Sequence, residues 1–246
     1  MYKSNLNYFL KNYIKKNLSP NKLELIYEDI NELSLNKYNE ILKWYNKISK
    51  KNHCWKINTK PLNQIADWKI SNEGNLNSKK KFFEIIGIKV QNTHDREVGS
   101  NGWEQPLIKE KNSPAAIIGI LRKRFDDVPH YLIEAKAEPG NFKFTQIGAT
   151  VQATLSNINR NHKGKSPTFS NFFINYDKKN LLFKKKMSED GGRFYKKITV
   201  GICLNTKKNI KIPKRYFWAT KRQIKRIIYD KSCMVHPHLR ALISYL

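Results

Sequence analysis

Lys136 and Glu138 stand two positions apart at the end of an alternating stretch, residues 130–136, that is typical of a β-strand. Residues two apart on a strand point to the same side, so these two side chains are expected to share one surface. A common pocket of low dielectric would suit the pair to acid and base chemistry. A salt-linked surface pair is the alternative, and the residues alone leave both open.

A row of polar residues alternates with apolar ones at residues 149–156, after the Pro-Gly-Asn turn signal at 139–141. If this stretch is a strand, its apolar side chains enter the core and its polar ones line the opposite face. An ordinary half-exposed strand would show the same pattern, because threonine favours β structure. The expected polar face carries Thr150, Gln152, Thr154 and Ser156.

Further polar candidates lie in two loops. Residues 160–165 are basic and include Arg160 and His162, and the Gly-rich residues 188–195 end in Arg193, Phe194 and Tyr195. His236 and His238 stand two apart, which is not a helical metal-ligand spacing, so no metal site is expected there. The chain contains no Walker-type phosphate loop, no GxGxxG, no HExxH and no GxSxG.

The composition fits one large domain of a globular protein. The chain has 246 residues, 39% hydrophobic residues and a formal net charge of +27. Its lysines are scattered among Asn and Ile, so we expect attraction of small anions rather than a nucleic-acid-binding face. No apolar run is long enough to span a membrane, no secretory signal is evident, and three scattered cysteines indicate no disulfide framework, so we expect a cytoplasmic protein without a membrane contact.

The order of expected elements favours an α+β fold. Helical periodicity runs through residues 1–51, with a break at Ser19-Pro20, and a short helix is expected at 61–68. Strand-like stretches follow at 82–90, 96–108, 115–124, 130–136, 142–147 and 198–204. A late helix should begin at Thr220 as its cap, and another should end the chain. We therefore expect an N-terminal helical extension, residues 1–60, before a main domain of residues 61–246.

Seven segments together resemble the nucleotide-diphosphate (NDP)-hexose 2,3-dehydratase family, whose order they keep over residues 62–246. They read FFEIIGIKV, EVGSNGWEQPLI, GILRKRFDDVPHYLIEAKAEPGN, ATVQATLSNINRNHKGK, SEDGGRFY, YFWATKRQIKRI and HLRALISYL. The combination of AKAEPGN, TVQATLSN and EDGGRF is the specific part. Two segments depart from the family pattern, residues 77–81 and 196–199.

The resemblance implies a Nudix-hydrolase-like α/β sandwich without the Nudix metal-binding box, and a reaction that needs no cofactor. Familiar members carry two such units in tandem, whereas this chain has one, so a homodimer with the site near the subunit interface is expected. The implied reaction removes water from a nucleotide-linked, expected dTDP-linked, 4-keto-6-deoxyhexose and gives a 3,4-diketo-2,6-dideoxy sugar. The alternatives are a non-catalytic nucleotide-sugar-binding subunit and, less favoured, a basic nucleic-acid-binding protein.

Roles for individual residues follow from the resemblance as expectations. Glu138 would be the leading base or acid, Lys136 would stabilise the enolate or act as acid, and His162 is a second acid–base candidate. Arginine suits a diphosphate and aromatic rings suit stacking on a base or a sugar. The expected substrate-binding residues are Trp103, Thr150, Gln152, Thr154, Ser156, Asn157, Arg160, Arg193, Phe194, Tyr195 and Arg240.

Overall fold

A large mixed sheet carries most of the elements in the described part of the chain, which comprises residue 12 and residues 34–52, 54–78, 83–94, 96–110, 116–158 and 165–246 of a computed structural model. Its central order is β11-β6-β5-β10-β9. Strands β5 and β10 run parallel and the other pairs run antiparallel. The strands are β5 (Ala116–Phe125), β6 (Val128–Ala137), β7 (Thr145–Gly148), β8 (Val151–Ala153), β9 (Leu181–Ser188), β10 (Ile198–Asn205) and β11 (Tyr216–Ala219).

Strands β5 and β6 form a fork. They pair with each other only from their shared turn to Arg122 and Tyr131. Beyond that point β8 pairs with β5 and β7 pairs with β6, so the two strands separate. The side chain of Thr150 lies in the angle of the fork, where its hydroxyl accepts from Leu121 N at 2.9 Å and donates to Leu132 O at 2.5 Å. Thr150 thus satisfies the backbone groups that separation leaves without a strand partner.

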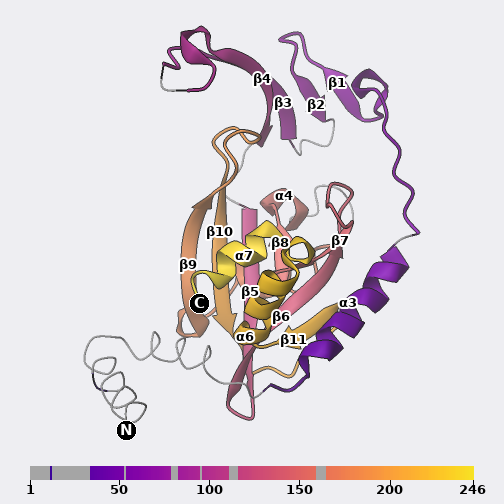
Figure 1. The fold of residues 1–246 in the computed structure, drawn as a ribbon, viewed down its shortest axis with the longest axis vertical. Helices are drawn as coiled ribbons and strands as arrows, with labels where there is room; N and C mark the ends of the chain where they lie inside the picture. Colours follow the sequence, from indigo (N-terminus) through magenta and orange to yellow (C-terminus); the bar gives the residue numbers. More distant parts are fainter. Residues whose placement is uncertain are drawn as a thin grey trace.

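Helices pack against both faces of this sheet, and Figure 1 shows the larger ones in front of it. Ile118 and Ile120 of β5 belong to the core cluster beneath α3 (Tyr38–Asn52), α6 (Lys221–Asp230) and α7 (Pro237–Ile243), with the turn η4 (Ser232–Met234) between the last two. Ile117 and Leu121 belong to the other cluster, beside α4 (Leu155–Ile158) and α5 (Ser170–Ile174). Because strand side chains alternate between faces, both faces of β5 are buried.

Helix α3 lies within the segment expected to be an N-terminal extension, and it packs into the core of the large sheet. Ile41 is fully buried and Tyr45 is 5% exposed, both in the cluster with α6 and α7. The Tyr45 hydroxyl donates to Thr145 O at 2.8 Å, and Trp44 Nε1 donates to Lys214 O at 2.9 Å. The apolar face and these polar contacts join α3 to β7 and to the segment before β11.

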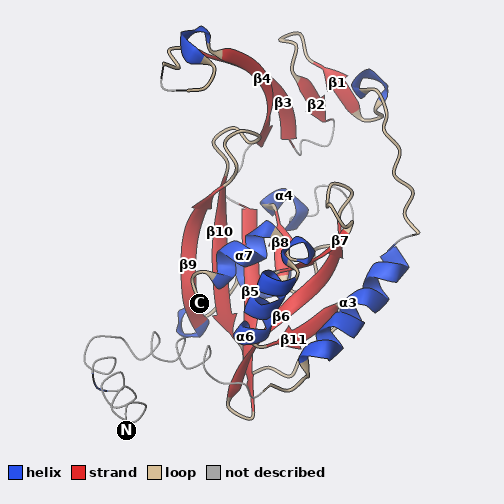
Figure 2. Cartoon of the chain, in the orientation of Figure 1, coloured by secondary structure: helices blue, strands red, loops and turns tan. Residues whose placement is uncertain are grey.

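A second, antiparallel sheet stands beyond the end of the large one, in the order β1-β2-β3-β4 (Figure 2). Residues 189–197, between β9 and β10, reach this sheet: Ile108 N donates to Arg193 O and Tyr195 N donates to Ile108 O, both at 2.9 Å. An ion pair of 2.7 Å joins Lys197 to Glu110 nearby. The elements of this part are η1 (Leu62–Gln64), β1 (Trp68–Ile70), β2 (Leu76–Ser78), β3 (Phe83–Val90), η2 (Gly99–Asn101) and β4 (Trp103–Glu110), whereas η3 (Lys178–Asn180) directly precedes β9 of the large sheet.

The α+β class and several elements predicted from sequence are confirmed. Thr220 caps α6 in a capping box, since its hydroxyl accepts from Gln223 N and the Gln223 side chain accepts from Thr220 N. The C-terminal helix is α7. The expected helices in residues 1–33 lie outside the described residues. No helix in the described part of the chain is long and apolar enough to cross a membrane.

Four predicted elements are wrong in extent. The strand expected at 96–108 begins only at Trp103, because the 3₁₀ turn η2 precedes it. The helix expected at 61–68 is a single 3₁₀ turn, because Asp67 has φ 65° and Trp68 already begins β1. The strand expected at 142–147 begins only at Thr145, because Phe144 has φ 55° and closes a turn back onto Glu138. The strand expected at 149–156 ends at Ala153 and gives way to α4.

Candidate active site

The open end of the fork places Lys136 beside Glu138. Lys136 lies near the end of β6, and Glu138 follows that strand directly. Their side chains form an ion pair with Nζ and Oε1 2.7 Å apart, and each is about one-third exposed, at 29% and 31%. Lys136 Nζ also donates to the backbone oxygen of Gln152 on β8, at 3.4 Å. One charged pair therefore spans the gap between the separating strands.

His236 approaches the same carboxylate from the C-terminal part of the chain. Val235 forms a parallel bridge with Ile147 of β7, and His236 N donates to Ile147 O at 2.9 Å. The His236 ring caps α7, since Nδ1 accepts from His238 N at 3.3 Å. Its Nε2 lies 3.6 Å from Glu138 Oε2, a contact longer than a hydrogen bond.

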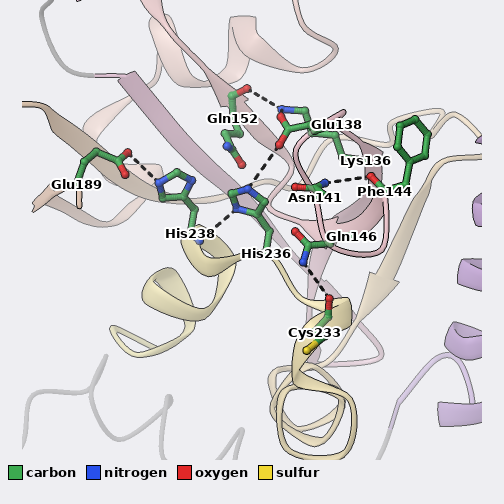
Figure 3. A network of polar contacts seen from close by, with 10 residues as sticks. All are labelled: Lys136, Glu138, Asn141, Phe144, Gln146, Gln152, Glu189, Cys233, His236 and His238. Carbon is green, nitrogen blue, oxygen red and sulfur yellow. Dashed lines mark hydrogen bonds and ion pairs between the residues drawn. The ribbon is translucent and has the colours of Figure 1, made fainter. Parts of the chain in front are cut away.

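His238 and Glu189 form a second pair next to the first. His238 Nε2 lies 2.8 Å from Glu189 Oε1, and the two imidazole centroids are 4.9 Å apart with 33° between their planes. Figure 3 shows the Gln152 side chain pointing toward these rings and toward Glu138. Within the described structure, Gln152 Oε1 and His238 Nδ1 are buried without a hydrogen-bond partner. Buried acceptors without donors are costly, so these two atoms mark a place for a ligand or a bound water.

The surroundings hold both carboxylates in their ionised form. Burial alone would raise the pKa of Glu138, but His236 and Lys136 outweigh it and lower this pKa to about 2 from its usual 4.5. The hydrogen bond with His238 lowers the pKa of Glu189, and the charges of Lys197 and His236 act in the same direction against burial. At neutral pH Glu138 and Glu189 are therefore both ionised, and they lie beside Lys136 and the imidazole rings of His236 and His238.

We name the set Lys136, Glu138, Glu189, His236 and His238 the acid–base cluster. Imidazole can take up and release protons near neutral pH, and the lysine can stabilise a developing oxyanion. Such a set suits removal of a proton beside a carbonyl and protonation of a leaving group. In the described ranges, no three or more His, Cys, Asp or Glu side chains are arranged to hold a metal ion.

Comparison with known proteins identifies the family. The sequence model described as NDP-hexose 2,3-dehydratase matches residues 38–246. The chain belongs to the NDP-hexose 2,3-dehydratase family. The matched range begins at the first residue of α3 and includes every residue of the acid–base cluster.

Three curated relatives carry the description dTDP-4-dehydro-6-deoxy-alpha-D-glucopyranose 2,3-dehydratase. The protein from Saccharopolyspora spinosa is 29% identical over 204 residues, which is 78% of this chain and 41% of the relative. Those from Amycolatopsis orientalis and Streptomyces violaceoruber are 31% and 30% identical, over 68% and 69% of this chain and 35% and 38% of their own lengths. This family member thus spans well under half of the length of these curated relatives.

A solved structure described as an ADP compounds hydrolase aligns with 77% of this chain and 94% of its own, at a TM-score of 0.38 and 12% identity. That similarity is too low to carry a conclusion about fold or function. The α+β class of this dehydratase-family chain rests on its own sheets and helices, and the Nudix-like part of the description stays a prediction.

Of the site residues predicted for this family member, Lys136, Glu138 and Gln152 come together. Thr150 does not join them, because it is fully buried in the fork and both hydroxyl contacts go to backbone groups. Thr154 precedes α4 and its hydroxyl accepts from Asn157 N at 3.3 Å. The continuous polar strand face is therefore wrong: Ser156 and Asn157 lie in α4, not on a strand.

Trp103 and the residues of the Gly-rich loop lie at the small sheet. Trp103 lines a hollow of about 520 Å³ together with Arg96, Gln105, Gly191 and Gly192, among other residues. Gln105 accepts from Trp103 Nε1 at 2.6 Å and donates to Gly192 O at 2.7 Å, which fixes the indole against the loop. The structure thus places Trp103 in a hollow separate from the contacts of the acid–base cluster.

The next residues of that loop face different neighbours. Arg193 is largely exposed and lies 3.5 Å from Asp190, while lysines stand over the rings of Phe194 and Tyr195. Arg240 is exposed on α7, one turn beyond His236. Arg160 and His162 lie outside the described residues.

Sequence reasoning missed three residues of the cluster: His236, His238 and Glu189. The spacing of the two histidines argues against a metal site, and the sequence pattern indicates no other role for them. Two signals were present, since Glu189 lies inside the segment EDGGRF and His238 begins HLRALISYL, both among the segments that resemble the family. No local pattern indicates that Glu138 and His236, far apart in the sequence, approach each other. Their approach follows from the bridge between Val235 and Ile147.

Proposed function

We propose that this protein removes water across carbons 2 and 3 of a nucleotide-linked 4-keto-6-deoxyhexose. The observation that carries the proposal is the Lys136–Glu138–His236 contact at the open fork, in a chain that belongs to the NDP-hexose 2,3-dehydratase family. The product would be a 3,4-diketo-2,6-dideoxy sugar. A dTDP-linked sugar is the first candidate substrate because the printed descriptions of three relatives name one.

The reaction needs only proton transfers and charge stabilisation. The ketone at carbon 4 acidifies the hydrogen on carbon 3, and removal of that proton places an electron pair on the carbon 4 oxygen. The electron pair returns as the carbon 2 hydroxyl leaves with one added proton as water, and the resulting enol tautomerises to the diketone. No redox cofactor is required because the ketone is already present, and a positioned acid or base contributes about 10²–10⁴-fold.

The cluster offers a group for each task. The Lys136 ammonium would stabilise the negative charge that develops on the carbon 4 oxygen. His236 Nε2 carries the ring proton, because Nδ1 is occupied as an acceptor, so it can protonate the leaving hydroxyl. Glu138, with a pKa of about 2, is ionised and is therefore not a proton donor at neutral pH. Its charge holds Lys136 and His236 in place, and Gln152 would bind a sugar hydroxyl.

Incubation with dTDP-4-keto-6-deoxyglucose tests this function directly. We expect mass spectrometry to show the loss of one water from the nucleotide sugar. Exchange of the carbon 3 hydrogen with deuterated solvent, without loss of water, would show enolate formation alone and contradict the complete reaction. Binding of the nucleotide sugar with no change in mass and no exchange would favour the non-catalytic subunit instead.

We further propose a homodimer in which each subunit takes the place of one unit of a longer relative, with the site near the subunit interface. The support is the resemblance, since familiar members of the family carry two such units in tandem. Sedimentation velocity at working concentrations should give twice the 29.0 kDa mass of the chain. A stable monomer that turns over substrate would contradict the dimer.

We also propose a cytoplasmic location, because the three cysteines are free thiols, as is usual in reducing compartments.

A further inference from the structure

His238 differs from its neighbour His236 in one respect that matters for proton transfer. The His236 Nδ1 lone pair is occupied by the backbone N–H of His238. The His238 Nδ1 atom has no hydrogen-bond partner within the described structure, although it is buried. This basic lone pair therefore has no competing donor, and it can accept a proton when a substrate or a water molecule reaches it.

The partner at the other nitrogen fixes which tautomer is present. His238 Nε2 lies 2.8 Å from Glu189 Oε1, and the lowered pKa of Glu189 keeps that carboxylate ionised. An ionised carboxylate only accepts hydrogen bonds, so Nε2 must carry the proton in the neutral ring. The Nδ1 lone pair is then directed away from Glu189. This is the arrangement in which a base is oriented by a third group.

We propose that His238 is the base of the dehydration and that Glu189 is its positioning residue. The proton leaves carbon 3 and reaches His238 Nδ1 directly or through one water, and the electron pair moves to the carbon 4 oxygen. The ring becomes an imidazolium, which the negative charge of Glu189 stabilises. His236 supplies the proton for the leaving hydroxyl. The inference rests on the proposed function and assigns the base within that same cluster.

The surroundings of His238 are consistent with one base and one acid. His236 stands beside it on the same segment, Glu138 and Lys136 face the pair from β6, and Glu189 approaches from the end of β9 with Lys197 nearby. Glu189 is only 11% exposed at its side chain, so its charge acts on the imidazole with little screening. Two imidazoles, each beside its own carboxylate, match the two proton transfers of the elimination.

Glu189→Gln is the variant that tests the assignment. We expect kcat to fall about 10²-fold or more with KM changed only a few-fold, because the amide no longer stabilises the imidazolium. Glu189→Asp should recover part of the loss, and Glu73→Gln, in an exposed loop, should behave as wild type.

A measurement without substrate separates this inference from the proposed function. Nitrogen-15 NMR of the wild-type histidines should show His238 as the Nε2–H tautomer and a mixture of tautomers in Glu189→Gln. An Nδ1–H tautomer in the wild type, or an unchanged kcat in Glu189→Gln, would overturn the assignment. If no water is lost from the nucleotide sugar, the proposed function fails, while the NMR result still decides whether Glu189 positions His238.

Discussion

Replacing Glu138 by Gln should lower kcat for dehydration by about 10²–10⁴-fold while the protein remains folded and binds the nucleotide sugar. The carboxylate lies 2.7 Å from Lys136 Nζ and 3.6 Å from His236 Nε2, so it sets the position of both groups. An amide of nearly the same shape keeps the packing but loses the charge. Single-turnover kinetics with a circular dichroism spectrum of the same sample measures both effects.

A matched control is Glu104→Gln, since that carboxylate is 72% exposed in its surface ion pair with Lys89. We expect it to change kcat less than twofold, because exposed pairs contribute little. Turnover of Glu138→Gln at the wild-type rate would remove Glu138 from the mechanism. A loss of nucleotide-sugar binding equal to the loss of turnover would instead make it a binding residue.

Replacing Ile41 by Ala should lower the free energy of unfolding by about 2–5 kcal/mol. Ile41 is fully buried on α3, in the cluster that also holds residues of β5, α6 and α7. Removing its side-chain atoms leaves a cavity in the main core, because the surrounding strands and helices relax only partly. Urea unfolding followed by tryptophan fluorescence and circular dichroism gives the change.

Leu35→Ala is the comparison, because Leu35 is 54% exposed and precedes α3. Its expected effect is within about 0.5 kcal/mol. If residues 1–60 form a separable extension, Ile41→Ala would leave the main transition unchanged and the two variants would behave alike. A single shifted transition would instead show that α3 folds with the large sheet, and that the boundary proposed at residue 60 belongs elsewhere.

The sequence by itself determined the elements with strong local signals. The alternation at 130–136 predicts that Lys136 and Glu138 share one side, and the ion pair shows that they meet. The Thr220 cap and the class of fold also follow from local chemistry. Short-range rules succeed here because periodicity, turn residues and caps depend on neighbours within a few positions. The same rules predicted the extended stretch after Gly148 but not its end at Ala153.

Tertiary structure alone decided what the polar residues do. Thr150 was expected to face a ligand, yet its hydroxyl bonds two backbone groups where β5 separates from β6. His236 and Glu189 join the cluster because a bridge between Val235 and Ile147, and the end of β9, bring them to the fork. Such meetings depend on the register between strands far apart in the chain, which local propensity does not encode.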